Sequence, residues 1–203
     1  MKVVPYKKGF GEIYNDMDLS SPYQSPLGEI SLRIIYQFGL MANKIPGVAA
    51  EAGVFGGYSL LTLANVFDRE IHAFDSWNGL PDISDQDGEF LHKGGFTASI
   101  DLVKERLSFT DKVIYHHGFF NETFPDIDKS IRFNYAFCDV DLYQSVLECF
   151  EFFYPRMNPG GVLFFDDCFC EHTPGAKIAI DEIVESHPEL NVYVTGGFVV
   201  FDV

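Results

Sequence analysis

Aspartates follow two apolar runs of the sequence, at the points where those runs end. The segment YAFCDVDLYQ places Asp139 and Asp141 after one run, and FFDDC places Asp166 and Asp167 after another. Asp139, Asp166 and Asp167 offer only hard oxygen ligands, which suit Mg²⁺, Mn²⁺ or Ca²⁺ rather than zinc or copper. Neighbouring Asp166 and Asp167 would face opposite sides of a regular strand, so both can reach one ion only if the chain bends there. The pattern therefore indicates a candidate cation site at the ends of two strands.

A glycine-rich turn is the second candidate binding element. In EAGVFGGYS, Gly53, Gly56 and Gly57 join an apolar run to a helical pattern and let backbone N–H groups approach a ligand closely. The spacing is not the G-x-G-x-x-G of dinucleotide sites, and Glu51 would face a pyrophosphate, which disfavours a nicotinamide or flavin dinucleotide. Asp75, about 20 residues beyond the glycines, is placed to accept hydrogen bonds from ribose hydroxyls. A nucleoside ligand without phosphates fits both features, and S-adenosylmethionine, whose sulfonium is positive, is one.

Hydrophobic periodicity predicts the elements that position these residues. Apolar side chains that recur every three or four residues indicate helices, and short apolar runs bounded by turn residues indicate strands. The predicted helices cover residues 27–42, 58–67, 97–109, 142–154 and 175–187. The predicted strands cover residues 47–53, 70–75, 112–118, 132–139 and 162–167, followed by two β-rich runs within 191–203. The helix that begins near residue 142 is expected to stop at NPGG (158–161).

This alternation predicts an α/β fold, with a mostly parallel seven-stranded sheet, helices on both faces and a C-terminal antiparallel hairpin. Ligands bind beyond the carboxyl ends of the strands in such sheets. The residues at those ends are Glu51 with Gly53, Asp75, Gly118, Asp139 with Asp141, and Asp166 with Asp167. Any single carboxylate there could be a helix cap or a solvated turn residue. The set is harder to explain in that way, because so many like charges repel one another unless a positive group joins them.

Other metal sites are weaker interpretations of the sequence. Cys168, Cys170 and His172 suggest zinc, but C-x-C-x-H has no second ligand pair elsewhere in the chain. The segment DISDQDGE is close to a calcium loop, yet its first and last ligand positions carry no acid. His116 and His117, at the end of the third predicted strand, are interpreted as packed or solvated side chains rather than catalytic ones.

Composition bounds the class of protein. A chain of 203 residues, 47% of them hydrophobic, can bury one sizeable core, so a single domain over residues 1–203 is expected, with residues 1–26 as an irregular arm or lid. Fourteen Lys and Arg against 30 Asp and Glu give a formal net charge of −16. That charge repels phosphate backbones and anionic lipid, so neither nucleic acid nor a membrane is an expected partner. No long apolar stretch is present, and a cytoplasmic protein is expected.

Four segments together resemble the macrocin O-methyltransferase family, which consists of metal-dependent class I methyltransferases. They are EAGVFGGYS, FDSWNGLPD, FCDVDLYQSVLECFEFFYPRMNPGGVLFFDDC and PGAKIAIDEI, and the resemblance spans roughly residues 25–187. Its most specific part runs from D-x-D-L-Y through P-G-G to D-D. The resemblance implies a Rossmann-like methyltransferase fold, S-adenosylmethionine as methyl donor and Mg²⁺ in the site. The chain is shorter than expected for the antibiotic-tailoring members of the family, and its CFCEHT segment departs from the pattern.

The resemblance also implies roles for individual residues. Asp139, Asp166 and Asp167 would be the metal ligands and Asp141 the general base, so that Asp139 and Asp141 are the catalytic pair. The implied cofactor site places Glu51, Gly53 and Ser59 beside the methionine part, Asp75 and Ser76 at the ribose, and Gly118 and Phe119 against the adenine.

The expected function is methyl transfer from S-adenosylmethionine to a hydroxyl of a small molecule of the sugar or natural-product type, with Mg²⁺ in the site. A metal-dependent hydrolase is an alternative, although it leaves Asp75 and the glycine turn without a role. A methyltransferase-like binding protein without catalysis is another. The helix at residues 27–42 and the aromatic side chains of the N-terminal arm could also form a homodimer surface.

Overall fold

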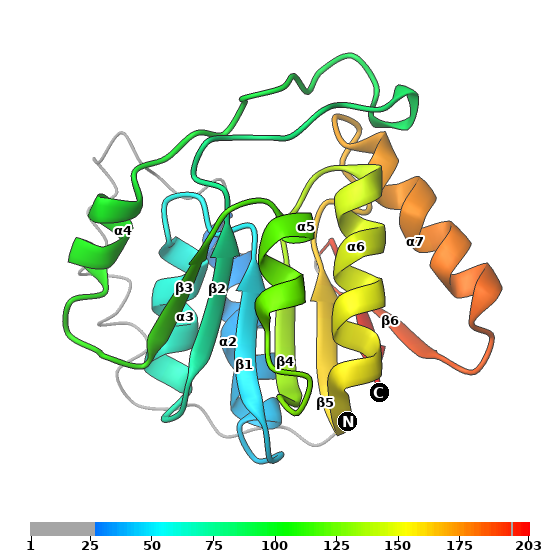
Figure 1. The fold of residues 1–203 in the computed structure, drawn as a ribbon. Coiled ribbons are helices and arrows are strands. Elements are labelled where there is room, and N and C mark those ends of the chain that lie inside the picture. The colour runs from blue at the N-terminus through cyan, green and yellow to red at the C-terminus, as the bar shows by residue number, and fades with distance from the viewer. Residues whose placement is uncertain (1–26, 196) are drawn as a thin grey trace.

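A computed structural model describes residues 27–195 and 197–203 of the chain. These residues form one seven-stranded sheet in the order β3-β2-β1-β4-β5-β7-β6 (Figure 1). The strands are β1 (Val48–Ala52), β2 (Ile71–Asp75), β3 (Val113–His117), β4 (Phe133–Cys138), β5 (Met157–Phe165), β6 (Asn191–Thr195) and β7 (Phe198–Asp202). The first five strands pair in parallel, and β7 is antiparallel to both β5 and β6. The predicted sheet and its C-terminal hairpin are confirmed.

Helices cover both faces of the sheet, as predicted. The first group is α2 (Glu29–Ala42), α3 (Tyr58–Val66) and α4 (Ile100–Arg106), and the second is α5 (Phe120–Thr123), α6 (Tyr143–Phe153) and α7 (Pro174–Ser186). Each group packs on its own hydrophobic core, one on each side of the sheet. Figure 1 shows α5, α6 and α7 in front of the strands and α2 and α3 behind them. Successive side chains of β4 point to opposite faces of the sheet, so this strand contributes to both cores. Tyr135 belongs to the first core and its neighbour Ala136 to the second.

The sheet order places the expected binding edge at its centre. The chain runs outward from β1 through β2 to β3 and then returns to β4 on the other side of β1. The carboxyl ends of β1 and β4 are therefore adjacent at the point where the strand order reverses, where open α/β sheets bind ligands. The segment from residue 76 to residue 99, hereafter the roof segment, passes over these ends (Figure 1).

Two elements have boundaries that differ from the prediction. They are the fifth strand, which starts earlier than residue 162, and the helix expected at residues 97–109. Helix α6 ends at Phe153 and continues as a 3-10 turn, Tyr154–Arg156, while NPGG lies inside β5. The strand pairs with Phe133 at Met157 and resumes at Val162 opposite Tyr135, so the extra residues form an irregularity in the ladder rather than a loop. The predicted helix at residues 97–109 shortens to α4, because the Ser99 hydroxyl accepts the Leu102 N–H and fixes the helix start.

Three short elements were not predicted. They are the 3-10 turns Asp85–Asp87 and Phe124–Asp126, and the single-turn helix α5. The expected N-terminal arm lies outside the described residues, so its role as a lid stays a prediction, as do the single domain and the homodimer. No helix among the described residues combines the length and the apolar character needed to cross a bilayer.

Candidate active site

A cavity of about 590 Å³ opens at the carboxyl ends of the parallel strands, within the size range of small-molecule sites. It brings together nearly all of the side chains that the sequence singled out. Those that line it are Gly53, Ser59, Asp75, Ser76, Gly118, Phe119, Asp139, Asp141, Asp166 and Asp167. Glu51 does not line it and instead lies behind Ser59, fully buried.

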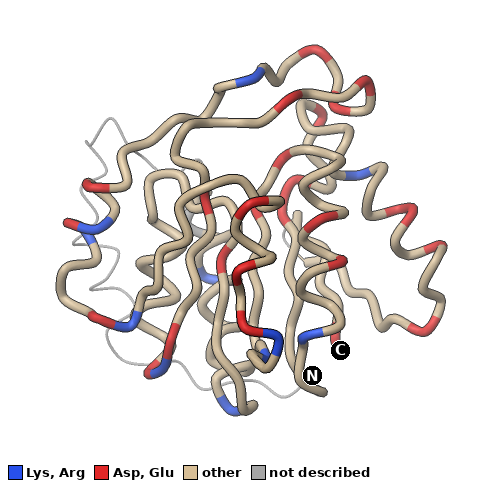
Figure 2. The backbone as a smooth tube through the Cα atoms, in the orientation of Figure 1, with Lys and Arg blue, Asp and Glu red and all other residues tan. Residues whose placement is uncertain are grey.

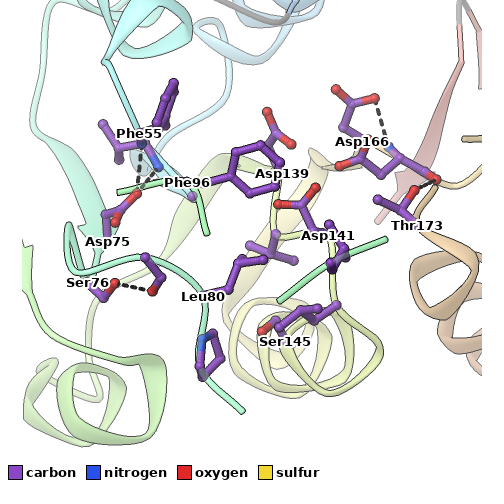
Figure 3. A pocket seen from close by; sticks show the side chains of 18 of the residues that line it. Phe55, Asp75, Ser76, Leu80, Phe96, Asp139, Asp141, Ser145, Asp166 and Thr173 are labelled. Carbon is purple, nitrogen blue, oxygen red and sulfur yellow. Dashed lines mark hydrogen bonds between the residues drawn. The ribbon is translucent and has the colours of Figure 1, made fainter. Parts of the chain in front are cut away.

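The carboxylates form one cluster. Carboxylate oxygens of Asp139, Asp166 and Asp167 lie within 4.8 Å of one another, and Figure 3 shows Asp141 next to them. The predicted bend is present, because Asp167 adopts a φ of 63° and its N–H donates to the Asp166 Oδ1 at 2.8 Å. The Thr173 hydroxyl donates to the Asp167 carbonyl at 2.9 Å and holds the bend in place. Two consecutive aspartates therefore serve one site.

Crowding and burial make this cluster costly to ionise. Burial first, and then the charges of the neighbouring aspartates, raise the pKa of Asp141 to about 8 and that of Asp166 to about 7. The same causes hold the pKa of Asp139 well above its ordinary value, and burial raises that of Asp167. The Asp167 Oδ2 is buried and has no hydrogen-bond partner. Hard oxygen donors that repel one another and leave an atom unsatisfied are what a divalent cation would join, so the residues fit Mg²⁺.

The raised pKa values predict that the metal-free protein loses stability with rising pH. A carboxyl whose pKa is higher in the folded state binds its proton more tightly there, so folding is penalised as the pH rises toward that pKa. With a pKa of about 7 for Asp166 and of about 8 for both Asp141 and the buried Glu51, the free energy of unfolding should fall by about 4 to 5 kcal/mol between pH 6.5 and 8.5. The pKa of His116 is lowered to about 4, so its opposite contribution grows as the pH rises to the ordinary histidine pKa of 6.5 and adds only about 0.4 kcal/mol within this window.

Urea denaturation in EDTA at both pH values measures this effect. The Asp141→Asn variant should show a smaller difference between the two pH values, and Mg²⁺ should restore stability to the wild-type protein at pH 8.5. A profile that is flat or rises with pH in the metal-free wild type would contradict the crowding of the cluster.

The glycine turn is shaped by Asp75. The Asp75 Oδ2 accepts the backbone N–H groups of Val54 at 2.7 Å and Phe55 at 2.8 Å, and its Oδ1 accepts the Trp77 N–H at 2.6 Å. One carboxylate thus ties the end of β2 to the turn after β1. Gly53 has a φ of 82°, and its backbone lies against the Asp139 carbonyl at the end of β4. A side chain at this position would overlap that carbonyl, so the turn can form only with glycine there.

Glu51 and Ser59 form a buried pair beneath the cavity. The Ser59 hydroxyl donates to the Glu51 Oε1 at 2.6 Å, while the Oε2 is buried without a hydrogen-bond partner. Burial raises the pKa of Glu51 to about 8, with a smaller contribution from the charge of Asp75. An unsatisfied acceptor in this position is suited to a cationic or N–H donor group that enters the cavity above it.

Strained backbone is concentrated around the cavity. Among the described residues, Phe55, Trp77, Phe96, Asp141 and Asp167 are the non-glycine residues with positive φ, between 47° and 63°. All of them except Trp77 line the cavity. Left-handed backbone at a non-glycine residue costs energy and is found most often where function requires a particular side-chain direction.

Two residues that fix the elements around the cavity were not identified from the sequence. Asp87 is 1% exposed, and its Oδ1 accepts the Tyr143 N–H at 2.6 Å at the start of α6, so it fastens the roof segment to that helix. The Arg106 guanidinium donates to the Gly56 carbonyl and stacks on the Tyr58 ring at 4.1 Å, which braces the glycine turn from α4. In the sequence, each of these two residues is a charged side chain in a polar segment, and nothing in the pattern distinguishes it from a solvated surface residue.

The weaker candidate residues form no metal-binding group among the described residues, although Cys170 and His172 line the cavity. The thiol of Cys168 is buried and donates to the Asp166 carbonyl at 3.2 Å, while Cys170 is exposed. His172 stacks on Phe90 at a centroid distance of 4.2 Å. His116 is packed, with its Nε2 2.9 Å from the Nδ1 of His72.

The model of the macrocin-O-methyltransferase (TylF) family matches residues 36–189. The chain belongs to this family. The match covers both the glycine turn after β1 and the aspartate cluster after β4 and β5, so the family assignment and the cavity concern the same residues.

Curated relatives of the chain are O-methyltransferases. One relative, from Streptomyces olivaceus, is 8-demethyl-8-(2,3-dimethoxy-alpha-L-rhamnosyl)-tetracenomycin-C 4'-O-methyltransferase. It is 28% identical over 145 residues, which are 63% of this chain and 55% of the relative. Mycinamicin III 3''-O-methyltransferase from Micromonospora griseorubida is 28% identical over 168 residues, 72% of this chain and 64% of the relative. The chain therefore matches only 55% to 64% of the length of these curated relatives.

Solved structures share the fold. The O-methyltransferase NovP superposes with a TM-score of 0.74 at 22% identity, covering 88% of this chain and 81% of NovP. An O-methyltransferase from Bacillus cereus in complex with SAH superposes with a TM-score of 0.64 at 16% identity, covering 99% of this chain and 93% of that chain. The Rossmann-like class I methyltransferase fold is thereby confirmed.

Proposed function

We propose that the protein is an S-adenosylmethionine-dependent, Mg²⁺-dependent O-methyltransferase that acts on a hydroxyl of a small molecule of the sugar or natural-product type. The observation that carries the proposal is that the glycine turn with Asp75 and the cluster of Asp139, Asp166 and Asp167 open into the same cavity. The names of the curated relatives support methylation of a sugar or natural-product hydroxyl.

The residues around the glycine turn fit S-adenosylmethionine, which supplies an activated methyl group when bound. Glu51 presents a buried oxygen without a partner beneath the cavity, suited to the ammonium group of the methionine part. Asp75 and Ser76 line the cavity at the end of β2, where a ribose is bound in many related sheets. Two structures with the same fold support the assignment, because they are described in complex with SAH and with SAM.

Asp139, Asp166 and Asp167 would hold the cation. A divalent ion with oxygen ligands lowers the pKa of an alcohol bound beside it and fixes its position. The protein contributes a rigid set of donors, because Asp166 follows directly on β5 and donors from two adjacent strands meet at the bend of Asp167. The cluster would thus position the acceptor hydroxyl as well as the ion.

Asp141 is the proposed proton acceptor. It lines the cavity beside the cluster, and its pKa of about 8 in the metal-free protein is close to the range in which a general base works at neutral pH. The Asp141→Asn variant should lower kcat by about 10² to 10⁴-fold, with S-adenosylhomocysteine affinity unchanged. Asp126→Asn, an exposed site outside the cavity, serves as the control in the same assay. Full activity of Asp141→Asn would remove Asp141 from the reaction.

Calorimetry with S-adenosylhomocysteine separates this function from its rivals. Saturable binding, together with methyl transfer that stops in excess EDTA and returns with Mg²⁺, supports the proposed reaction. A metal-dependent hydrolase would cleave its substrate without binding S-adenosylhomocysteine, and a binding protein would bind it without turnover. Transfer that continues undiminished in EDTA would refute the role of the metal.

A further inference from the structure

Strand β6 forms one edge of the sheet, and it is uncharged and exposed. It is the last strand in the order β3-β2-β1-β4-β5-β7-β6, at the far end from β3 (Figure 1). Its sequence, NVYVT, contains no charged residue, and Figure 2 shows it as a tan stretch in a chain with a formal net charge of −16. Tyr193 is 55% exposed and Val194 is 62% exposed, on opposite faces of the sheet. An exposed apolar edge strand is a template for pairing with another strand.

The backbone of β6 faces away from β7 at Val192 and Val194. Residues of an antiparallel strand direct their N–H and C=O groups alternately to the neighbour on one side and to the neighbour on the other. Val203, directly after β7, donates its N–H to β5 at 3.2 Å, so Phe201 and Val199 also face β5 rather than β6. Val192 and Val194 are the residues paired with Phe201 and Val199. Their N–H and C=O groups therefore point to the open side of the edge.

The other edge of the sheet carries protection that β6 lacks. Lysine on or beside an edge strand discourages pairing with another chain. Lys112 directly precedes β3 and donates to the Phe67 carbonyl at 3.2 Å, and Lys104 of α4 lies over the Tyr115 ring of β3 at 5.5 Å. β6 contains neither a basic residue nor a proline. Of the two edges, β6 is therefore the one suited to association.

A second copy of the same strand fits this edge. In an antiparallel pair centred on Tyr193, Val192 of each copy meets Val194 of the other, so the outward N–H and C=O groups of the two copies bond to one another. Asn191 meets Thr195, the valines form β-branched pairs on one face, and the two tyrosines meet on the other. We propose that β6 pairs in this way with β6 of a second copy, which makes a symmetric homodimer with one continuous sheet.

The charge and size of the paired stretch set its strength. Glu189, the nearest preceding acid, lies outside β6, so no acid faces another within the paired strands. The negative charge of the two copies still opposes association, and salt screens this repulsion. Two strands of five residues make an interface at the low end of the size range, so we expect a dissociation constant on the order of 10 to 100 µM.

The proposed dimer does not depend on the proposed function. β6 runs parallel to β5, because β7 is antiparallel to both. Antiparallel pairing of two β6 strands therefore turns the parallel strands of the two copies in opposite directions. The two cavities then open at opposite edges of the joined sheet, and each is built from one copy. Loss of the dimer should leave S-adenosylhomocysteine affinity unchanged, so failure of either proposal can be told from failure of the other.

Sedimentation velocity of the full chain, in about 0.5 M NaCl to screen repulsion, tests the proposal. The wild type should be mostly monomer at about 5 µM and mostly dimer at about 500 µM. Val194→Pro removes an outward N–H and no hydrogen bond to β7, and Val194→Lys adds a charge to the edge. Each should raise the dissociation constant at least about tenfold, while circular dichroism stays that of the wild type. A monomeric wild type at the higher concentration, or a dimer that survives both folded variants, overturns the proposal.

Two matched controls carry the same new charge on other exposed apolar side chains. Ile114→Lys lies on β3 and Ile30→Lys on α2, where the side chains are 37% and 72% exposed. Both should leave the dissociation constant within about twofold of the wild type, because charge outside the interface acts only through screened repulsion. Dissociation caused by either control, and not by the Val194 variants, would place the interface elsewhere and overturn the assignment to β6.

Amide hydrogen exchange of the wild type tests the pairing without any substitution. The amides of Val192 and Val194 should exchange more slowly at about 500 µM than at about 5 µM, because pairing removes them from water. The Tyr193 amide, which faces β7, should change less. Equal exchange of Val192 and Val194 at both concentrations contradicts the pairing of β6, whether another part of the same chain covers the edge or nothing does.

Discussion

Replacing Asp139 by alanine should lower methyl transfer by roughly 10³-fold while S-adenosylhomocysteine affinity stays within about threefold of wild type. Asp139 supplies one of three carboxylates whose oxygens lie within 4.8 Å of one another, and two acids are a poor site for a hard cation. The glycine turn is held by Asp75 rather than by Asp139, so the nucleoside part of the cavity should survive the substitution.

The free energy of unfolding of Asp139→Ala distinguishes the loss of the cation site from a general loss of structure. Since the pKa of Asp139 is raised by burial and by the neighbouring aspartates, its removal should relieve repulsion in the metal-free protein at pH 8.5. We therefore expect the free energy of unfolding of Asp139→Ala in EDTA to be no lower than that of wild type. Mg²⁺ should stabilise the wild type and not the variant. Activity of Asp139→Ala close to that of the exposed control Asp126→Ala would show that the cluster is not the cation site.

Gly53→Ala is expected to have the largest effect on stability, about 3–5 kcal/mol. The residue has a φ of 82°, and a Cβ there would overlap the Asp139 carbonyl, which is backbone and cannot rotate away. The ends of β1 and β4 would have to separate, and the hydrogen bond from the Gly53 N–H to the Phe74 carbonyl at 3.0 Å would be strained. S-adenosylhomocysteine binding should be lost with it.

Gly94→Ala is the matched control for that substitution. Its φ of 78° is nearly the same, but a Cβ there would have no atom within 4 Å. It should therefore cost only the intrinsic price of a left-handed residue, about 1 kcal/mol. Urea denaturation of both variants measures the difference. Equal destabilisation would mean that the close approach of the two strands at Gly53 does not constrain the fold.

The acidic residues of the site could be predicted because the parallel sheet alone determines that they lie close together. A parallel sheet brings its strand ends to one edge, so apolar runs followed by Gly53, Asp75, Asp139 and Asp166 were enough to infer a common cavity. The bend at Asp167 was also foreseeable, because two consecutive aspartates cannot share one ion on a regular strand.

The residues that hold the site in place could not be predicted, because their partners are distant in the sequence. Asp87 caps a helix 56 residues away, and Arg106 reaches a carbonyl 50 residues away. NPGG has the composition of a turn, yet tertiary contacts keep it in the sheet, among them the Asn158 side-chain amide that donates to the Pro46 carbonyl at 2.7 Å. Local propensity is overridden in each case by contacts that appear only once the sheet is assembled.

Co-crystallisation with Mg²⁺ and S-adenosylhomocysteine tests the central claim most directly. We predict electron density for one cation bound by Asp139, Asp166 and Asp167, with the nucleoside in the same cavity between Gly53 and Asp75. A cation bound elsewhere, or a cavity that stays empty at saturating concentrations of both ligands, would contradict the proposed chemistry.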